Sequence, residues 1–240
     1  MARTDRPVAL FAALEAEARA LARHLAPSTR PSPHLSIWEG TVEGTPVVLV
    51  QTGVGKVAAA LAAQFVCDVF HPRCVIAFGL AGATTNDVPP GRLIVASSAL
   101  QHDIDARPLT SAKGTIPSLG IAALPADPTW SEKLRKATES VIKNQQRISL
   151  GLVLTGDQIV TSREVRDGLK RDFPEGACFD METAAIAQVA IQNGIPWAAL
   201  RMTSDAADET FNIEEVIGFG INTAADLFDR IVRAFLKDVS

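Results

Sequence analysis

Apolar strands alternate with helical segments along almost the whole chain, and this alternation limits the possible folds more than any other feature. Residues 7–14 form an apolar run typical of a buried strand, and residues 15–25 place leucine and alanine at helical spacing. Two extended runs, 35–42 and 45–52, predict a hairpin. Further strands are predicted at 74–79, 92–100, 148–156 and 195–203, and further helices at 57–70, 130–141, 180–193 and 214–237. The pattern predicts an α/β fold with a mostly parallel or mixed sheet that is covered on both faces.

Length and composition favour one cytoplasmic domain that binds a small molecule. With 240 residues, 47% of them hydrophobic, the chain can bury a large core, and we expect residues 1–240 to form a single domain. The net charge is −4 with acids and bases interleaved, so no surface for nucleic acid or an anionic membrane is expected. The three cysteines lie in apolar runs without a CxxC pair, which favours reduced thiols and the cytoplasm.

Two motifs are typical of other kinds of site. "GVGKVA", residues 53–58, matches the relaxed dinucleotide pattern G-x-G-x-x-A, but the next strand ends without an acid that could bind a ribose. Lys56 mimics a phosphate-binding loop, yet Val50 and Val57 occupy the positions of its first glycine and its Ser/Thr. We therefore prefer a tight strand-to-helix turn. "HDID", residues 102–105, has no second histidine nearby, and a strand would alternate its side chains, so no metal site is expected.

Three acidic residues lie where a mostly apolar element begins or ends. Glu17 follows the first strand, Glu182 lies in the first turn of a predicted helix, and Asp205 follows the strand at 195–203. In α/β sheets, ligands bind beyond the carboxyl ends of the strands, which places Asp205 and the loop at 79–87 at the functional edge. A helix N-terminus also favours an acidic side chain, so Glu182 alone has a purely structural interpretation.

Seven stretches of the sequence together resemble one known family. In chain order they are "ALEAEARAL", "TGVGKVAAA", "GLAG", "QHDID", "TGDQIV", "RDFPEGACFDMETAAIAQVA" and "IPWAALRMTSDAAD". The chain resembles the purine nucleoside phosphorylase and uridine phosphorylase superfamily, most closely its hydrolytic branch, the 5'-methylthioadenosine/S-adenosylhomocysteine nucleosidases. The resemblance implies a single α/β domain with a twisted, partly closed mixed sheet flanked by helices. It also implies a homodimer whose partner subunit lends residues to the pocket.

The resemblance assigns a role to each acid. Glu17 would activate the attacking water, and Glu182 with Met181 would bind the ribose. Asp205, oriented by Ser204, would protonate N7 of the purine. These roles fit the chemistry, because breaking the bond to N9 leaves positive charge on the sugar and negative charge on the base. The substrate-binding residues that the resemblance implies are Leu80, Ala81, Gly82, Ile159, Val160, Met181, Glu182 and Ser204.

Asp205 must keep its proton at neutral pH, which requires burial. We therefore expect the long connection at 106–129, or a partner subunit, to cover the pocket when ligand is bound.

Some positions depart from the family pattern. Phosphorolytic relatives have an arginine and a serine where this chain has Ala77 and Leu80, so phosphate would lack a cationic partner and hydrolysis is favoured. Ile159 and Val160 stand where such nucleosidases usually stack an aromatic residue on the base. The 5' substituent of the substrate stays open, and a futalosine-like or lipid-linked nucleoside is among the alternatives.

The sequence thus predicts a purine nucleosidase that hydrolyses the N-glycosidic bond of a 5'-modified adenosine without a metal or an organic cofactor. One alternative is a phosphate-dependent nucleoside phosphorylase whose phosphate site uses other residues, such as Arg107 or an arginine of the partner subunit. Another is a nucleoside-binding module without catalysis, against which the presence of all three acids argues.

Overall fold

The structure is a computed structural model that describes residues 6–30, 32, 34–143 and 147–240. Within these ranges the chain forms one mixed sheet of ten strands and eight helical segments. The strands are β1 (Val8–Ala12), β2 (Ala26–Pro27), β3 (Ser36–Val42), β4 (Thr45–Gln51), β5 (Cys74–Ala83), β6 (Leu93–Gln101), β7 (Leu124–Pro125), β8 (Ile148–Thr155), β9 (Gly176–Asp180) and β10 (Trp197–Asp205). The helices are α1 (Glu15–Ala22), α2 (Lys56–Phe70), α3 (Pro128–Val141), α4 (Arg163–Asp172), α5 (Thr183–Gln192), α6 (Ile213–Phe219), the π-helical turn η3 (Gly220–Ala224) and α7 (Ala225–Asp238).

Five of the strands close into a barrel. β5 pairs with β9 and also with β10, while β6 and β8 complete the ring between β10 and β9. From β5 the sheet continues through β1, β4 and β3 to β2, and β7 pairs with β6. The β5–β10 pair is parallel and the β5–β9 pair antiparallel. The prediction of a mixed, partly closed sheet flanked by helices is therefore confirmed.

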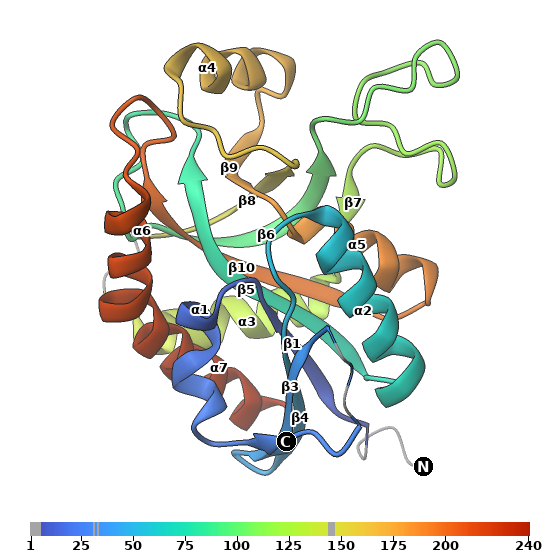
Figure 1. Ribbon diagram of the computed structural model, residues 1–240, viewed down its shortest axis with the longest axis vertical. Helices are drawn as coiled ribbons and strands as arrows, with labels where there is room; N and C mark the ends of the chain where they lie inside the picture. Colours follow the sequence, from blue (N-terminus) through green and yellow to red (C-terminus); the bar gives the residue numbers. More distant parts are fainter. Residues whose placement is uncertain (1–5, 31, 33, 144–146) are drawn as a thin grey trace.

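Helices cover the sheet on two faces (Figure 1). α2 and α5 pack on one face, in an apolar cluster that includes Phe11 and Val50. α1, α3 and α7 pack on the other face, in a cluster that includes Leu10 and Leu49. Because successive residues of a strand point to opposite faces, β1 and β4 are apolar throughout and read in the sequence as continuous buried runs.

Several strands differ from the prediction. The strand predicted to end at residue 79 continues to Ala83, because Leu80 and Ala81 pair with β10 and the last two residues of β5 pair with β9. β9 itself was not predicted, and neither was α4. The sequence of α4, from Arg163 to Asp172, is largely charged, and only Arg166 and Leu169 are buried in it.

Two predicted helices have different boundaries. The helix predicted from residue 180 begins at Thr183, because Asp180 ends β9 and Glu182 is the N-cap residue rather than a first-turn residue. The predicted cap by Asp180 still exists in part, since its Oδ2 accepts from the Thr183 N–H at 3.1 Å. The helix predicted over 214–237 consists of α6, η3 and α7, which follow one another directly.

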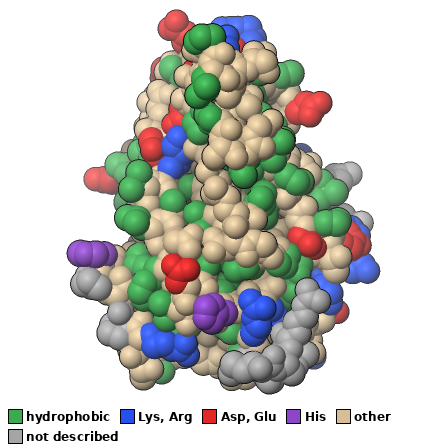
Figure 2. Space-filling view, turned by 90° about the vertical axis from the view of Figure 1, so that its right-hand side faces the viewer, with side chains coloured by type: hydrophobic (Ala, Val, Ile, Leu, Met, Phe, Trp, Pro, Cys, Tyr) green, Lys and Arg blue, Asp and Glu red, His purple; other side chains and the backbone are tan. Residues whose placement is uncertain are grey.

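One face of the molecule carries α2, α5 and the connection at 106–129. Figure 2 shows hydrophobic side chains spread over the upper and middle parts of this face, with most of the charged side chains at its edges and lower end. Val57 and Leu61 of α2 and Leu109 of the connection are among the most exposed apolar residues of the chain, with 71%, 67% and 79% of their surface accessible. Across the described ranges, no helix combines the length and the apolar character of a membrane span.

Candidate active site

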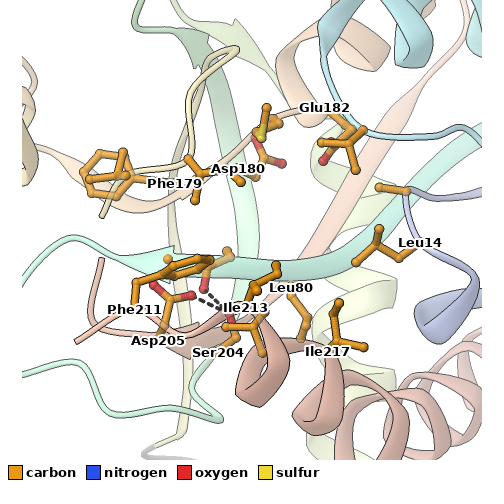
Figure 3. A pocket seen from close by; sticks show the side chains of 18 of the residues that line it. Leu14, Leu80, Phe179, Asp180, Glu182, Ser204, Asp205, Phe211, Ile213 and Ile217 are labelled. Atoms are coloured by element: carbon orange, nitrogen blue, oxygen red, sulfur yellow. Dashed lines mark hydrogen bonds between the residues drawn. The ribbon is translucent and has the colours of Figure 1, made fainter. Parts of the chain in front are cut away.

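A pocket of about 200 Å³ opens where β5, β9 and β10 end (Figure 3). Every site residue predicted from the sequence lines it. Those residues are Glu17, Leu80, Ala81, Gly82, Ile159, Val160, Met181, Glu182, Ser204 and Asp205. The structure adds Ala13, Leu14, Val54, Gln158, Phe179, Asp180, Phe211, Ile213, Val216 and Ile217. All of the charged side chains among these lining residues are carboxylates, and the rest of the wall is mostly apolar.

Glu17 reaches the pocket from α1 and is held by three backbone N–H groups. Its Oε2 accepts from Ala13 at 3.0 Å and from Leu14 at 2.9 Å, and its Oε1 accepts from Leu80 at 2.8 Å. Burial raises the pKa of this carboxyl above its ordinary value, while Arg201 and the three N–H donors act in the opposite direction. The carboxylate is thus fixed in place and more basic than an exposed glutamate.

Glu182 is the N-cap residue of α5 and binds the glycine turn before α2. Its Oε1 accepts from the Gly55 N–H at 3.0 Å. Burial raises its pKa to about 7, against the lowering effect of Arg201. Gly53 and Gly55 adopt positive φ angles of 78° and 100°, so the motif at 53–58 is the tight turn that the sequence favoured. Its N–H groups bind carboxylates, since the Lys56 N–H donates to Asp157 at 2.7 Å.

A buried arginine that the sequence patterns did not predict lies behind the two glutamates. Arg201 of β10 is 2% exposed, and its Nη2 lies 2.7 Å from Asp180 Oδ2 and 3.8 Å from Glu182 Oε2. Its Nε donates to Thr183 Oγ1 at 2.9 Å. The only signal in the sequence was a charged residue in the middle of the apolar run at 195–203, because a buried charge needs partners nearby.

Arg201 and Glu17 leave no room for a side chain at position 79 of β5. A Cβ atom at Gly79 would lie 2.6 Å from Arg201 Nη1 and 2.7 Å from Glu17 Oε1. Glycine at this position therefore allows the arginine and the glutamate to approach the strand backbone.

Asp205 is the last residue of β10 and lies on the other side of the pocket. The Ser204 hydroxyl donates to its Oδ2 at 2.7 Å, and the Ala207 N–H donates to its Oδ1 at 2.8 Å. Burial raises the pKa of Asp205, although both hydrogen bonds lower it. The pairing of β10 with β5 shifts by one residue between Thr203 and Asp205, so a bulge sets the direction of this carboxyl group.

Two aromatic residues of the pocket were also missed. Ile159 and Val160 lie in the pocket as expected, but Phe179 of β9 and Phe211 after β10 line it as well. Figure 3 places both phenylalanines on the same side as Asp205. Aromatic residues make up only 5% of the chain, so the nearness of these two to Glu182 and Asp205 in sequence was the available signal.

No residue of 106–129 is among the described residues of this chain that line the pocket; α6 lines it, through Ile213, Val216 and Ile217. Asn212 starts this helix, since its Oδ1 accepts from the Glu214 N–H at 2.9 Å. Cover by the 106–129 connection or by a partner subunit when ligand is bound stays a prediction.

The other candidate residues lie elsewhere. Asp103 Oδ1 binds Lys56 Nζ at 2.6 Å, and Asp105 Oδ2 binds Arg107 Nη2 at 2.5 Å, so the "HDID" acids form ion pairs with basic residues. His102 is buried beside Phe179. In the described ranges, no three His, Cys, Asp or Glu side chains gather in a way that could hold a metal ion. Arg107, the phosphate-binding candidate, is among the exposed residues outside the pocket.

The chain is similar to known proteins in both sequence and structure. The model of the family described as the phosphorylase superfamily matches residues 7–237. A 5'-methylthioadenosine/S-adenosylhomocysteine nucleosidase of Actinobacillus succinogenes is 36% identical over 173 residues, which cover 72% of this chain and 73% of the relative. One of Staphylococcus haemolyticus is 30% identical over 83% of this chain and 87% of its own. Among solved structures, the nucleosidase of Neisseria meningitidis in complex with methylthio-immucillin-A superimposes with a TM-score of 0.89. It is 29% identical, over 97% of this chain and 99% of that one.

Proposed function

The chain belongs to the phosphorylase superfamily, and from this premise we propose that it is a purine nucleosidase that hydrolyses the N-glycosidic bond of a 5'-modified adenosine. The nucleosidases that it resembles are named for 5'-methylthioadenosine and S-adenosylhomocysteine, which are substrates of this kind. One observation carries the proposal: Glu17, Glu182 and Asp205 line a single pocket whose remaining wall is mostly apolar. Three carboxyl groups so placed can serve the water, the sugar and the base of one nucleoside.

In the proposed reaction, each carboxyl group acts on a different part: the water, the sugar or the base. Water attacks C1' and gives a proton to Glu17, while the C1'–N9 bond breaks and the base leaves with the electron pair. The base takes up a proton at N7 from Asp205. The transition state has oxocarbenium character, so the negative field of Glu17 and Glu182 stabilises the positive sugar.

The environment of each carboxyl group suits its proposed role. Glu17 has a raised pKa, which makes its carboxylate a better base for the water proton. Glu182, with Met181 beside it in the pocket, accepts a hydrogen bond from a ribose hydroxyl. Asp205 has a raised pKa, which favours the protonated form that the departing base needs, and Ser204 fixes its orientation.

The aromatic residues support a purine on the side of Asp205. Phe179 and Phe211 lie on that side of the pocket and offer ring surface to a flat base. They supply aromatic contact that Ile159 and Val160 lack. The 5' end of the nucleoside then lies on the opposite side, toward Leu14.

Hydrolysis is favoured over phosphorolysis because of the charge in the pocket. Phosphate would need a cation, and none of the described residues that line the pocket is lysine or arginine. Arg201 lies close by, but its charge is already engaged by the carboxylate of Asp180. An anion in this pocket would meet three or more carboxylates instead of a partner.

We propose further that the protein is a cytoplasmic homodimer and that residues 1–240 form one domain. The exposed apolar side chains of Val57, Leu61 and Leu109 support an interface on the face that Figure 2 shows. The three cysteines are free and buried, which supports a reducing compartment.

The test is release of the purine base from a panel of nucleosides in phosphate-free buffer. Adenosine, 5'-methylthioadenosine, S-adenosylhomocysteine and futalosine are incubated with the protein, and the free base is separated by chromatography. Release of the base without phosphate supports the proposal. Turnover that depends strictly on added phosphate would support a phosphorylase. Tight binding of a nucleoside without release of the base would support a binding module.

A further inference from the structure

We propose that Arg166 of α4 is a positioning residue for Asp205: its guanidinium holds the peptide unit whose N–H donates to the Asp205 carboxyl group. This inference rests on the proposed function, in which Asp205 gives a proton to N7 of the base. It goes further by naming a residue that does not line the pocket and that keeps the proton donor in place.

The contact between the two residues runs through a single peptide unit. Arg166 Nη1 donates to the carbonyl oxygen of Ala206 at 3.0 Å. The N–H of the same peptide unit, which belongs to Ala207, donates to Asp205 Oδ1 at 2.8 Å. The C=O and the N–H of a trans peptide point in opposite directions, so the arginine binds one side of the unit and the carboxyl group binds the other. Hydrogen bonds linked in this way also polarise one another.

The guanidinium of Arg166 is itself fixed from several sides. Arg166 is only 3% exposed, although it lies in a largely charged helix. Its Nη1 also donates to Asn86 Oδ1 at 2.6 Å, and its Nε donates to Asp167 Oδ1 at 3.0 Å. Asn86 lies in the loop that follows β5, so one side chain connects α4 with the loops after β5 and β10. A rigid, planar group held at both ends sets the position of the Ala206 carbonyl group.

The loop after β10 has an unusual conformation at the residue that follows this carbonyl group. Ala207 adopts a φ of 50°, in the left-handed region, which a residue with a Cβ atom keeps only when its surroundings determine it. The Ala207 side chain is fully buried, and a Cβ atom at Gly82 would lie 3.1 Å from the Ala207 Cβ. Packing thus holds the side chain, and Arg166 holds the peptide unit before it. Without the arginine, this unit can rotate and turn its N–H away from Asp205.

A second arginine of α4 contacts the same loop at a different point. Arg163 lies one turn before Arg166, and its Nη2 is 3.5 Å from Asp208 Oδ2. Its side chain is 56% exposed and reaches Asp208 and Glu209, beyond the peptide unit that Arg166 binds. Arg163→Met is therefore a matched control, since it removes the same charge from the same helix and the same loop.

The test compares Arg166→Met with Arg163→Met in the base-release assay. Methionine keeps an unbranched apolar side chain and removes the donors. Misplacement of a group at an active site by about 1 Å can cost about 10²-fold in rate, so we expect kcat to fall about 10- to 100-fold in Arg166→Met, with little change in KM. Arg163→Met should keep the wild-type kcat. With p-nitrophenyl riboside, whose leaving group departs without protonation, both variants should resemble the wild type.

A double-variant cycle separates positioning from a general structural role. In the Asp205→Asn background the proton donor is already absent, so the addition of Arg166→Met should cause no further loss of kcat. An equal loss in both backgrounds would contradict the proposal, because independent effects add in free energy.

Arg166→Lys serves as a second variant where the methionine variant does not fold. It keeps the buried charge, but its nitrogen ends one bond short of the arginine Nη1. We expect a loss of kcat of intermediate size, which again disappears in the Asp205→Asn background. Hydrogen exchange gives a readout without turnover, since the Ala207 N–H should exchange faster in both Arg166 variants than in Arg163→Met or the wild type.

The outcomes distinguish this inference from the proposed function. Release of the base by the wild type, with an unchanged kcat in Arg166→Met, would overturn the role of Arg166 and leave the nucleosidase intact. Equal losses with a purine nucleoside and with p-nitrophenyl riboside would also overturn it. Failure of the wild type to release a base from any nucleoside would remove the nucleosidase and this inference together.

Discussion

Arg201 and Asp180 form a buried ion pair with an Nη2–Oδ2 distance of 2.7 Å, directly behind the pocket. Glu182 and Glu17 lie around the same guanidinium, so one buried cation faces three carboxyl groups. Burial raises the pKa values of both glutamates, and Arg201 lowers them. The negative charges of Asp180 and Glu17 add to burial in raising the pKa of Glu182. The two members of the ion pair therefore act in opposite directions on the pKa of the residue that we assign to the sugar.

Gly79→Ala is expected to impair both stability and activity. The new Cβ atom would collide with Arg201 Nη1 and Glu17 Oε1, and overpacking of this kind costs about 1 to 3 kcal/mol of unfolding free energy. Urea denaturation and the adenine-release assay measure the two effects. The control is Gly168→Ala in α4, where the Cβ atom would meet only Arg171 Nη2 at 3.7 Å. The control change should stabilise the protein slightly. Wild-type stability and activity in Gly79→Ala would contradict the proposed collision with Arg201 and Glu17.

The stability of the protein should fall as the pH rises from about 4.5 to 7. The pKa of Glu182 is raised in the folded state to about 7, so between these values the folded chain binds more protons than the unfolded chain, and deprotonation costs stability. In Glu182→Gln this loss is absent. We expect its unfolding free energy relative to the wild type to improve by about 1 to 3 kcal/mol between pH 5 and pH 7.5. Parallel pH profiles of the two proteins in urea titrations would be inconsistent with the raised pKa.

Local patterns predicted the longer strands and placed the three acids at the ends of apolar elements, and the family resemblance assigned those acids to one site. The apolar runs of β1, β4 and β10 have lengths and flanks that leave few alternatives. The closure of the barrel depends on β10 pairing with two strands at once, which no local pattern reveals. It was expected only from the family resemblance.

The remaining misses have a common physical cause. Arg201 lies behind the pocket, and Phe179 and residues of α6 line it, because the fold brings together segments that are far apart in the chain. β9 was missed because its five residues include a glycine and end in an acid that looked like a helix cap. The contribution of α6 was not predicted, because Ile213 and Ile217 reach the pocket only through the loop that follows β10.

Glu17→Gln should reduce release of adenine by about 10²- to 10⁴-fold, because an amide cannot take the proton of the attacking water. The neutral side chain can still occupy the same space, so nucleoside binding should be retained in calorimetry. Glu175→Gln serves as the control, since Glu175 is exposed and lines none of the cavities around the site. Full activity of Glu17→Gln would exclude the proposed role of this residue as the base.

Asp205→Asn should also lose about 10²- to 10⁴-fold in turnover, because its amide cannot transfer a proton to N7. The loss should be smaller for a riboside whose leaving group departs without protonation, such as p-nitrophenyl riboside. We expect that comparison to separate a proton donor from a residue that only binds. An equal loss with both kinds of substrate would point to a structural effect.

Leu61→Lys should weaken the proposed homodimer. A charge in the centre of the apolar surface of α2 would have to be buried without a partner on association. Sedimentation velocity should show a shift toward monomer at micromolar concentration. Leu150→Lys is the matched control, because Leu150 of β8 is also highly exposed, at 59% against 67% for Leu61. A wild-type protein that sediments as a monomer would refute the dimer itself.

The walls and the acids of the pocket come from different parts of the fold. Asp205 sits on a barrel strand, with Glu182 and Glu17 fixed by hydrogen bonds to the backbone, whereas Ile213, Val216 and Ile217 belong to a short peripheral helix. Mutation can therefore change what the enzyme accepts without disturbing how it reacts. A library randomised at the three α6 positions should yield many folded, active variants with new preferences, which makes this helix the natural starting point for directed evolution.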